Sequence, residues 1–220
     1  FLIGSAMMEH DDLNAAVRRV LLGENKVCGL TREQDAQAAY EAGAIYGGLI
    51  FVDSSPRAVS EEQARKVMAA APLSYVGVFR NAEIADVAAK AERLFLSAVQ
   101  LHGDEDQAYI DSLRASLAPQ VQIWKAQSVG DMLPARNLNH VDKYVLDNGQ
   151  GGTGQRFDWS LLNGEKLGNV LLAGGLSPDN CVEAAKTGCA GLDFNSGVES
   201  EPGIKDASKL ASVFKTLRAY

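Results

Sequence analysis

Three side chains of reactive type lie at or just beyond short apolar runs. Cys28 stands in the run KVCGL, Asp147 ends the run KYVLD, and Arg57 follows a Ser-Ser-Pro turn. A carboxylate at the end of an apolar run is costly unless it is used or paired, so Asp147 is a candidate acid or base. Cys28 is either a packing residue or a thiolate, and its position alone favours neither. The planar fork of Arg57 suits a carboxylate, although a solvated surface arginine fits equally well.

Glycines follow two of the later apolar runs. Gly174 and Gly175 end the run NVLLAGG, and Ser196 and Gly197 follow the last run, GLDF. Turns of this kind present backbone N–H groups to an anion, and glycine lets the anion approach the backbone closely. We expect a phosphate site at these two turns. The alternative is that the glycines only form tight turns.

The run after Asp147 reads GQGGTG and formally matches the dinucleotide-binding pattern G-x-G-x-x-G. That pattern follows the first strand of its unit, opens a full helix and has an acidic residue about 20 residues later. Here no long helix follows, and the next apolar run carries no acid. We interpret the glycines, among them Gly152 and Gly154, as a loop that folds over a substrate, and we expect no nucleotide cofactor.

These candidates must be positioned by strands, because eight apolar runs of strand length recur along the chain. Amphipathic segments of helical period alternate with them, and many begin with an N-capping Ser, Thr, Asn or Asp. The predicted strands are 26–30, 45–51, 74–79, 97–103, 121–126, 143–148, 169–175 and 191–197. The predicted helices are 31–43, 60–71, 81–94, 104–117, 177–188 and 206–220.

Eight such units in one domain predict an α/β fold, a closed parallel (β/α)8 barrel. The units after the fifth and sixth strands are the weakest, because 129–138 contains Pro134 and 158–164 is short. Chemistry in this fold lies at the C-terminal strand ends, which adds Gln100 and His102 of the fourth strand and Lys125 of the fifth. His102 is either a substrate ligand or a structural hydrogen-bonder, and Lys125 is a candidate lining residue of the barrel core.

Composition excludes several classes of protein. The 220 residues carry a net charge of −7, which argues against nucleic acid or an anionic membrane as partner. No apolar run spans a bilayer, and the N-terminal FLIGSAMM lacks the basic flank of a signal peptide. Three cysteines without C-x-x-C spacing and three scattered histidines indicate a reducing cytoplasm and no metal site.

Residues 1–24 do not fit the count of eight units. FLIGSAMM predicts one more strand with a Gly-Ser turn, and DDLNAAVRRVLLG predicts one capped helix. We interpret this segment as a final βα unit from a preceding domain. The expected junction with the barrel of residues 25–220 lies near Gly23–Lys26.

Seven segments of the chain carry a resemblance to a known family. They are KVCGLT, GLIFVDSSPRAVS, YVGVF, VQLHGDE, LDNGQGGTGQRFDW, LLAGGLSPDN and GLDFNSGVE with PGIKD. On these segments the chain closely resembles the phosphoribosylanthranilate isomerase family over nearly all of residues 25–220. Residues 1–24 resemble the last βα unit of indole-3-glycerol-phosphate synthase, and the whole is similar to the C-terminal portion of the fused synthase–isomerase of enteric-type bacteria.

The resemblance implies an Amadori rearrangement of N-(5-phosphoribosyl)anthranilate to 1-(2-carboxyphenylamino)-1-deoxyribulose 5-phosphate in tryptophan biosynthesis, without cofactor or metal. It implies Cys28 as base, Asp147 as acid and Arg57 as ligand of the anthranilate carboxylate. It also implies a covalently fused synthase domain in the parent chain, and we expect a cytoplasmic monomer. The implied phosphate ligands are Gly174, Gly175, Ser196 and Gly197. From their positions in the chain we also predict substrate contacts by Gln100, His102, Gly152 and Gly154.

The implied chemistry makes demands on two pKa values. Acid–base catalysis is most efficient when both groups titrate near the working pH. Burial should therefore raise the pKa of Asp147, and nearby positive charge should lower the pKa of Cys28. The alternatives are another phosphosugar isomerase or epimerase on the same barrel, an inactive domain that supports a fused synthase, and a nucleotide-binding module.

Overall fold

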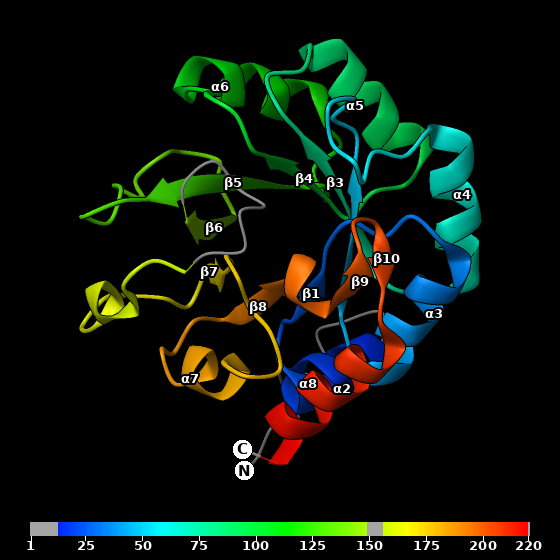
Figure 1. The fold of residues 1–220 in the computed structure, drawn as a ribbon. Helices are drawn as coiled ribbons and strands as arrows, with labels where there is room; N and C mark the ends of the chain where they lie inside the picture. Colours follow the sequence, from blue (N-terminus) through cyan, green and yellow to red (C-terminus); the bar gives the residue numbers. More distant parts are fainter. Residues whose placement is uncertain (1–12, 149–155, 220) are drawn as a thin grey trace.

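The computed structural model describes residues 13–148 and 156–219. Eight parallel strands pair in chain order, and the last pairs with the first, so the sheet closes into a barrel (Figure 1). The predicted (β/α)8 architecture is confirmed. The strands are β1 (Lys26–Val27), β2 (Tyr46–Ile50), β3 (Ser74–Phe79), β4 (Ala98–Leu101), β5 (Gln122–Val129), β6 (Lys143–Asn148), β7 (Val170–Leu172) and β8 (Gly191–Phe194).

Helices follow six of the eight strands and cover the outside of the barrel. Two of them have N-capping side chains of the predicted type. Ser60 accepts a hydrogen bond from the Gln63 N–H at the predicted start of its helix, whereas Asp106 accepts one from the Tyr109 N–H two residues after the predicted start at Asp104. Such caps satisfy backbone donors that the helix leaves unpaired. The helices are α3 (Glu33–Ala42), α4 (Glu61–Ala70), α5 (Ile84–Arg93), α6 (Gln107–Ser116), α7 (Cys181–Ala185) and α8 (Ala207–Ala219).

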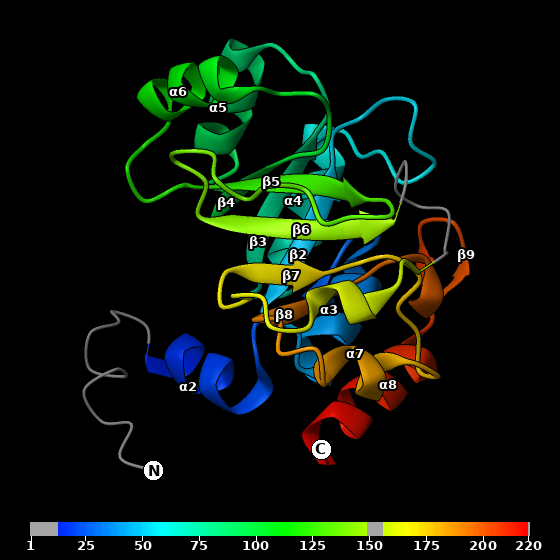
Figure 2. The ribbon, with the colours of Figure 1, turned by 90° about the vertical axis from the view of Figure 1, so that its left-hand side faces the viewer.

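The two weak units lack an α-helix in the described part of the chain. Residues 130–142 form a loop after β5, and the chain between β6 and β7 contains the 3-10 turn η1 (Trp159–Leu162). Figure 2 shows β5 and β6 without an α-helix in front of them. Leu133, Leu138 and Val141 of the loop pack on the core instead. None of the described helices is long and apolar enough to cross a membrane.

The helix predicted before the barrel is present as α2 (Leu13–Leu22), and Gly23 follows it with a positive φ of 73°. Arg18 attaches this helix to the barrel, since its Nη2 donates to the carbonyl oxygens of Tyr40 at 2.9 Å and Ala44 at 3.3 Å. The strand predicted at the start of the chain lies outside the described residues.

The segment after β8 contains a small hairpin that the sequence did not predict. The turn η2 (Ser196–Val198) leads into β9 (Glu199–Glu201), which pairs antiparallel with β10 (Ile204–Lys205). Gly203 makes the tight connection with a positive φ of 83°. Thr31 anchors the hairpin, because its Oγ1 donates to the Gly203 carbonyl at 2.5 Å. The hairpin therefore lies beside the end of β1.

The barrel interior changes from apolar to polar along its axis. Tyr46 and Trp124 are both buried and pack edge to face, with ring centroids 4.9 Å apart. Alternate residues of a strand face the same side, so Lys26 and Cys28 both face the interior. Cys28 packs with Ile50 and other buried apolar side chains. The charged Lys26 therefore lies inside the barrel, one strand period below the thiol.

Candidate active site

A cavity of about 390 Å³ opens at the C-terminal ends of the strands. Active sites of closed parallel barrels lie at this end. The cavity brings together side chains and turns from β1, β4, β6, β7 and β8 and from the loop after β2. Among the residues proposed from the sequence, its lining contains Cys28, Arg57, Gln100, His102, Asp147, Gly174, Gly175 and Ser196.

Cys28 lies directly beyond β1, and its backbone N–H donates to the Phe194 carbonyl at 2.8 Å. Lys26, two residues earlier, is fully buried. Its Nζ donates to Asp193 Oδ2 at 2.7 Å and to Gln100 Oε1 at 3.0 Å. These bonds hold an ammonium group inside the barrel directly beneath the thiol.

The pKa of Cys28 lies above its ordinary value, because burial of the thiol outweighs the positive charges of Lys26 and Lys205. Asp193 also acts to raise it. Our expectation of a lowered pKa is therefore wrong. The expected cations are present, but they offset only part of the desolvation of the thiolate.

Asp147 lies near the end of β6 and lines the same cavity. Burial raises the pKa of its carboxyl to about 6, although the Asn148 N–H donates to Oδ1 at 2.7 Å and acts to lower it. The expected upward shift is confirmed. Asp147 is therefore a carboxylic acid that is still partly protonated close to neutral pH.

Arg57 already has a carboxylate partner within the protein. Its Nε donates to Glu199 Oε1 at 2.9 Å, and its Nη2 donates to Glu199 Oε2 at 2.7 Å. The Ser-Ser-Pro turn holds the backbone of Arg57, since the Arg57 N–H donates to Ser55 Oγ at 3.1 Å. The carboxylate on this fork is Glu199 of the hairpin after β8, and the contact of Arg57 with a substrate carboxylate stays a prediction.

The predicted glycine turns differ in their roles. Gly174 and Gly175 line the cavity with positive φ angles of 87° and 63°, a backbone conformation that favours glycine. Gly197 is not a lining residue. A Cβ at Gly197 would lie 2.1 Å from the Leu176 carbonyl oxygen, so glycine is needed there for the close approach of two loops. Gly152 and Gly154 lie outside the described residues.

Gln100 and His102 form one wall of the cavity. The Gln100 side chain is buried, and its Nε2 lies 3.4 Å from His102 Nδ1. Burial lowers the pKa of His102, and the charge of Lys26 lowers it further, so its imidazole is neutral at pH 7. Lys125 is not a lining residue of this cavity, because its Nζ donates to Glu105 Oε2 at 2.8 Å and to the Gly103 carbonyl at 2.7 Å.

Sequence reasoning missed the charged groups that surround these residues. Asp193 lines the cavity, and its Oδ1 is buried with no hydrogen-bond partner among the described residues. Lys26 and Asp193 each interrupt an apolar strand with a charge, which is a signal that the sequence does contain. Glu199 and Lys205 carried no such signal, because the sequence predicted no strand at β9 or β10, where they lie.

In the described ranges, no group of three or more His, Cys, Asp and Glu side chains could hold a metal ion. The cavity instead combines a thiol, a carboxyl group, an arginine and two glycine turns. Titratable groups at the C-terminal mouth of a closed parallel barrel are typical of a (β/α)8-barrel enzyme. Comparison with known proteins identifies the family within that class.

Residues 25–216 match the model of the N-(5'phosphoribosyl)anthranilate (PRA) isomerase family. The chain belongs to this family. It is 76% identical over 220 residues to the tryptophan biosynthesis protein TrpCF of Salmonella typhi, covering 100% of this chain and 49% of that protein. For TrpCF of Yersinia pestis the identity is 69%, and 46% of that protein is covered. The chain thus spans about half the length of the curated relatives it matches.

Solved structures agree with the family and the fold. A phosphoribosylanthranilate isomerase from Thermus thermophilus superposes with a TM-score of 0.79 at 31% identity, covering 89% of this chain and 98% of that chain. The isomerase from Thermotoga maritima gives 0.79 at 32% identity, covering 90% and 100%. A further isomerase structure, in complex with reduced 1-(o-carboxyphenylamino)-1-deoxyribulose 5-phosphate, gives 0.76 at 32% identity over the same shares.

Proposed function

We propose that this chain carries out the family's Amadori rearrangement with Asp147 as general acid and Cys28 as general base. The observation that carries the proposal is that both side chains line one cavity, from β6 and from the end of β1. An acid and a base that act on two atoms of one small sugar must approach it from different strands. The raised pKa of Asp147, about 6, supports its role as the proton donor.

The proposed reaction moves protons without any electron carrier. Protonated Asp147 donates to the ring oxygen, the bond from that oxygen to C1′ breaks, and the nitrogen lone pair forms a Schiff base. The Cys28 thiolate then removes the C2′ proton, and the electron pair of that bond gives the enolamine. Protonation at C1′ and loss of the C2′ hydroxyl proton yield the ketone. Lys26 and Lys205 favour the thiolate by their positive charges.

The substrate's two anionic ends orient it in this proposal. Gly174, Gly175 and Ser196 lie together at the ends of β7 and β8, where glycine turns of barrels hold phosphate. Arg57 lies on the loop after β2 and would bind the anthranilate carboxylate. Gly197 supports the phosphate turn through its contact with Leu176. Gln100 and His102 would contact the sugar between the two ends.

The test follows the decay of anthranilate fluorescence as phosphoribosylanthranilate, made in situ, is consumed. Cys28→Ala and Asp147→Ala should each lower kcat by about a hundredfold or more, the usual contribution of a general acid or base. Arg57→Ala should mainly raise KM. Cys189→Ala and Asp111→Asn are matched controls, because Cys189 lines a different cavity and Asp111 is exposed on α6. Wild-type kcat in either catalytic variant would refute the acid–base assignment.

The fused synthase belongs to the proposal as well. The curated relatives are about twice as long as this chain, and residues 1–24 resemble the end of a synthase barrel. We propose that the parent chain also carries indole-3-glycerol-phosphate synthase, a decarboxylating lyase that uses the isomerase product. The division of the chain at about Glu24 is part of this proposal. The cytoplasmic location and the monomeric state stay predictions.

A further inference from the structure

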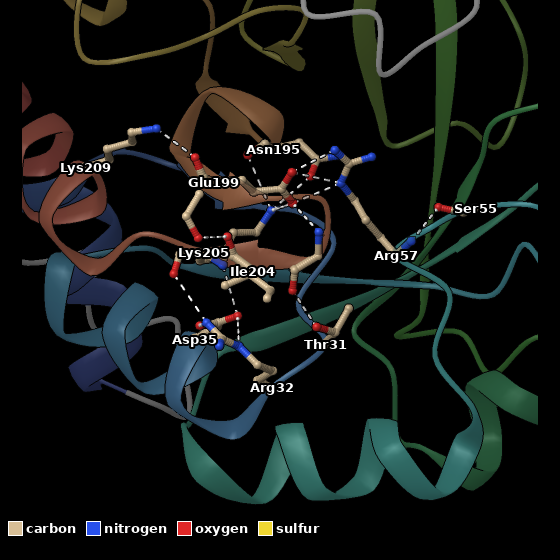
Figure 3. Close-up of polar contacts among 12 residues, drawn as sticks. Thr31, Arg32, Asp35, Ser55, Arg57, Asn195, Glu199, Ile204, Lys205 and Lys209 are labelled. Carbon is tan, nitrogen blue, oxygen red and sulfur yellow. Dashed lines mark hydrogen bonds and ion pairs between the residues drawn. The ribbon is translucent and has the colours of Figure 1, made fainter.

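Glu199 is the centre of a buried polar network on the hairpin after β8 (Figure 3). Its side chain is 5% exposed, and it accepts both in-plane hydrogen bonds from the Nε and Nη2 atoms of Arg57. Oε1 also accepts from Lys205 Nζ at 2.7 Å and from the Gly203 N–H at 3.2 Å. Four donor groups thus converge on a carboxylate that the proposed reaction does not use.

The Arg57–Glu199 pair leaves one edge of the guanidinium unused. Arg57 has five N–H donors in a planar fork, and Glu199 occupies the edge formed by Nε and Nη2. No described residue accepts a hydrogen bond from Nη1, and Figure 3 shows this nitrogen pointing away from Glu199. Arg57 lines the cavity, whereas Glu199 does not. A second carboxylate can therefore bind the outer edge, formed by Nη1 and Nη2.

Lys205, the third charged residue of the network, gives the network a net positive charge. A single glutamate would neutralise Arg57 and weaken its attraction for an anion. Lys205, whose side chain is 0% exposed, adds a second positive charge and also donates to Asn195 Oδ1 at 2.9 Å. Burial lowers the pKa of Lys205, and the charge of Glu199 opposes this shift. With Lys205 protonated, the three charges sum to +1. Burial acts to raise the pKa of Glu199, but the hydrogen bonds from Arg57 and the charge of Lys205 outweigh it, so Glu199 stays ionised.

Neighbouring residues hold both Lys205 and Arg57 in place. Asp35 of α3 accepts from the Lys205 N–H at 3.1 Å and from Arg32 Nη2 at 2.6 Å. A Cβ at Gly29 would lie 2.7 Å from Cδ of Arg57, so the arginine stem passes tightly over the end of β1. A guanidinium held this firmly loses little entropy when a ligand binds to it.

We infer that Glu199 is a positioning residue, which with Lys205 holds Arg57 so that its outer edge faces the carboxylate of the substrate's aromatic ring. This inference rests on the proposed function. The hairpin after β8 would then determine specificity for the acidic aromatic amine, although it never touches the substrate.

The test compares two substrates, phosphoribosylanthranilate and phosphoribosylaniline, which lacks the carboxylate. Glu199→Gln keeps the shape of the side chain but removes its charge. The Arg57 guanidinium then loses the ion pair that fixes its orientation. We expect KM for phosphoribosylanthranilate to rise by about tenfold or more, as for loss of one charge-assisted hydrogen bond, with kcat changed by less than about threefold. KM for phosphoribosylaniline should stay as in the wild type.

A double-mutant cycle separates positioning from general damage to the fold. In the Arg57→Ala background, Glu199→Gln should cause no further rise in KM, because there is no guanidinium whose orientation Glu199 could fix. Glu201→Gln on the exposed side of the same hairpin is the control and should match the wild type. If the glutamine variant folds poorly, Glu199→Asp is measured instead. It keeps the charge but shortens the side chain, so its KM should lie between those of the wild type and Arg57→Ala.

Two outcomes would overturn the inference. One is an unchanged KM for phosphoribosylanthranilate in both Glu199 variants. The other is an equal rise in KM for the two substrates, which would mean that Glu199 only maintains the cavity. Turnover of phosphoribosylanthranilate by the wild type is measured first. If the wild type lacks it, the proposed function itself fails, whereas activity without a carboxylate-dependent effect refutes the role of Glu199 alone.

Discussion

At the scale of single residues, burial acts on both titrating side chains in the same direction. It raises the pKa of Asp147 to about 6 and keeps the pKa of Cys28 above its ordinary value. The proposed reaction needs protonated Asp147 together with the Cys28 thiolate. This is the minor protonation state, because the acid has the lower pKa. Between the two pKa values its fraction is constant, since the carboxylic acid decreases as fast as the thiolate increases.

We therefore predict a broad plateau in the pH dependence of kcat/KM. The rate should fall about tenfold per pH unit below the Asp147 pKa of about 6 and stay level up to at least about pH 8.5, the ordinary pKa of a thiol. Because the substrate phosphate also titrates near pH 6, carbon-13 NMR of the ligand-free protein provides the control. It should show the Asp147 carboxyl titrating at about 6. A narrow optimum near pH 7 would contradict this assignment.

At the scale of elements, β2 must pass close to β1 for the thiol to face the cavity. Gly48 is buried within β2, and a Cβ there would lie 2.7 Å from Cys28 Sγ and 3.1 Å from Lys26 Cε. Contacts below 3.0 Å force something to move, and the rigid strand pairing leaves little room for it. Glycine is therefore needed at this position because it leaves room for the side chains of Cys28 and Lys26, and not because its own backbone conformation requires it.

We predict that Gly48→Ala lowers kcat/KM by about tenfold or more while the barrel still folds, because overpacking of about 1–3 kcal/mol would displace Cys28 and Lys26. Steady-state kinetics and the melting temperature are measured together. Gly168→Ala is the matched control, since a Cβ at Gly168 meets nothing within 4 Å. Full activity in Gly48→Ala, with the melting temperature of the wild type, would contradict the close packing of β2 on the thiol.

At the scale of the whole molecule, closure of the barrel is what creates the cavity. Pairing of β8 with β1 aligns Asp193 with Lys26 and brings the hairpin after β8 beside the loop after β2. The helix α2 lies outside this closed unit and is joined to it by Arg18. Among residues 13–148 and 156–219, none that precedes β1 lines the cavity.

We predict that this chain converts phosphoribosylanthranilate but forms no indoleglycerol phosphate, because one βα unit cannot supply a second barrel's active site. Product analysis by chromatography should show 1-(2-carboxyphenylamino)-1-deoxyribulose 5-phosphate accumulating. A full-length TrpCF relative, assayed under the same conditions, should carry the product further. Formation of indoleglycerol phosphate by this chain alone would contradict the proposed division of the two activities.

Local patterns made the fold and most of the cavity predictable. Strand length, helical period and capping residues depend on neighbours in sequence, so eight strands and the turns at Gly174 and Ser196 could be read directly. Once the barrel is assumed, the strand ends at Cys28 and Asp147 must lie at one face. The same local reasoning marked the units after the fifth and sixth strands as weak, and the described residues contain no α-helix there.

The sequence by itself thus determined the barrel, the family and the residue types at the mouth of the cavity. Only the tertiary structure decided the electrostatics. Lys26 pairs with Asp193 from 167 residues away, and Arg57 pairs with Glu199 from 142 residues away. The direction of the Cys28 pKa shift and the orientation of the Arg57 guanidinium both depend on such pairs and on burial. The physical reason is that desolvation and Coulomb energies depend on distance in space, which strand order and period do not specify.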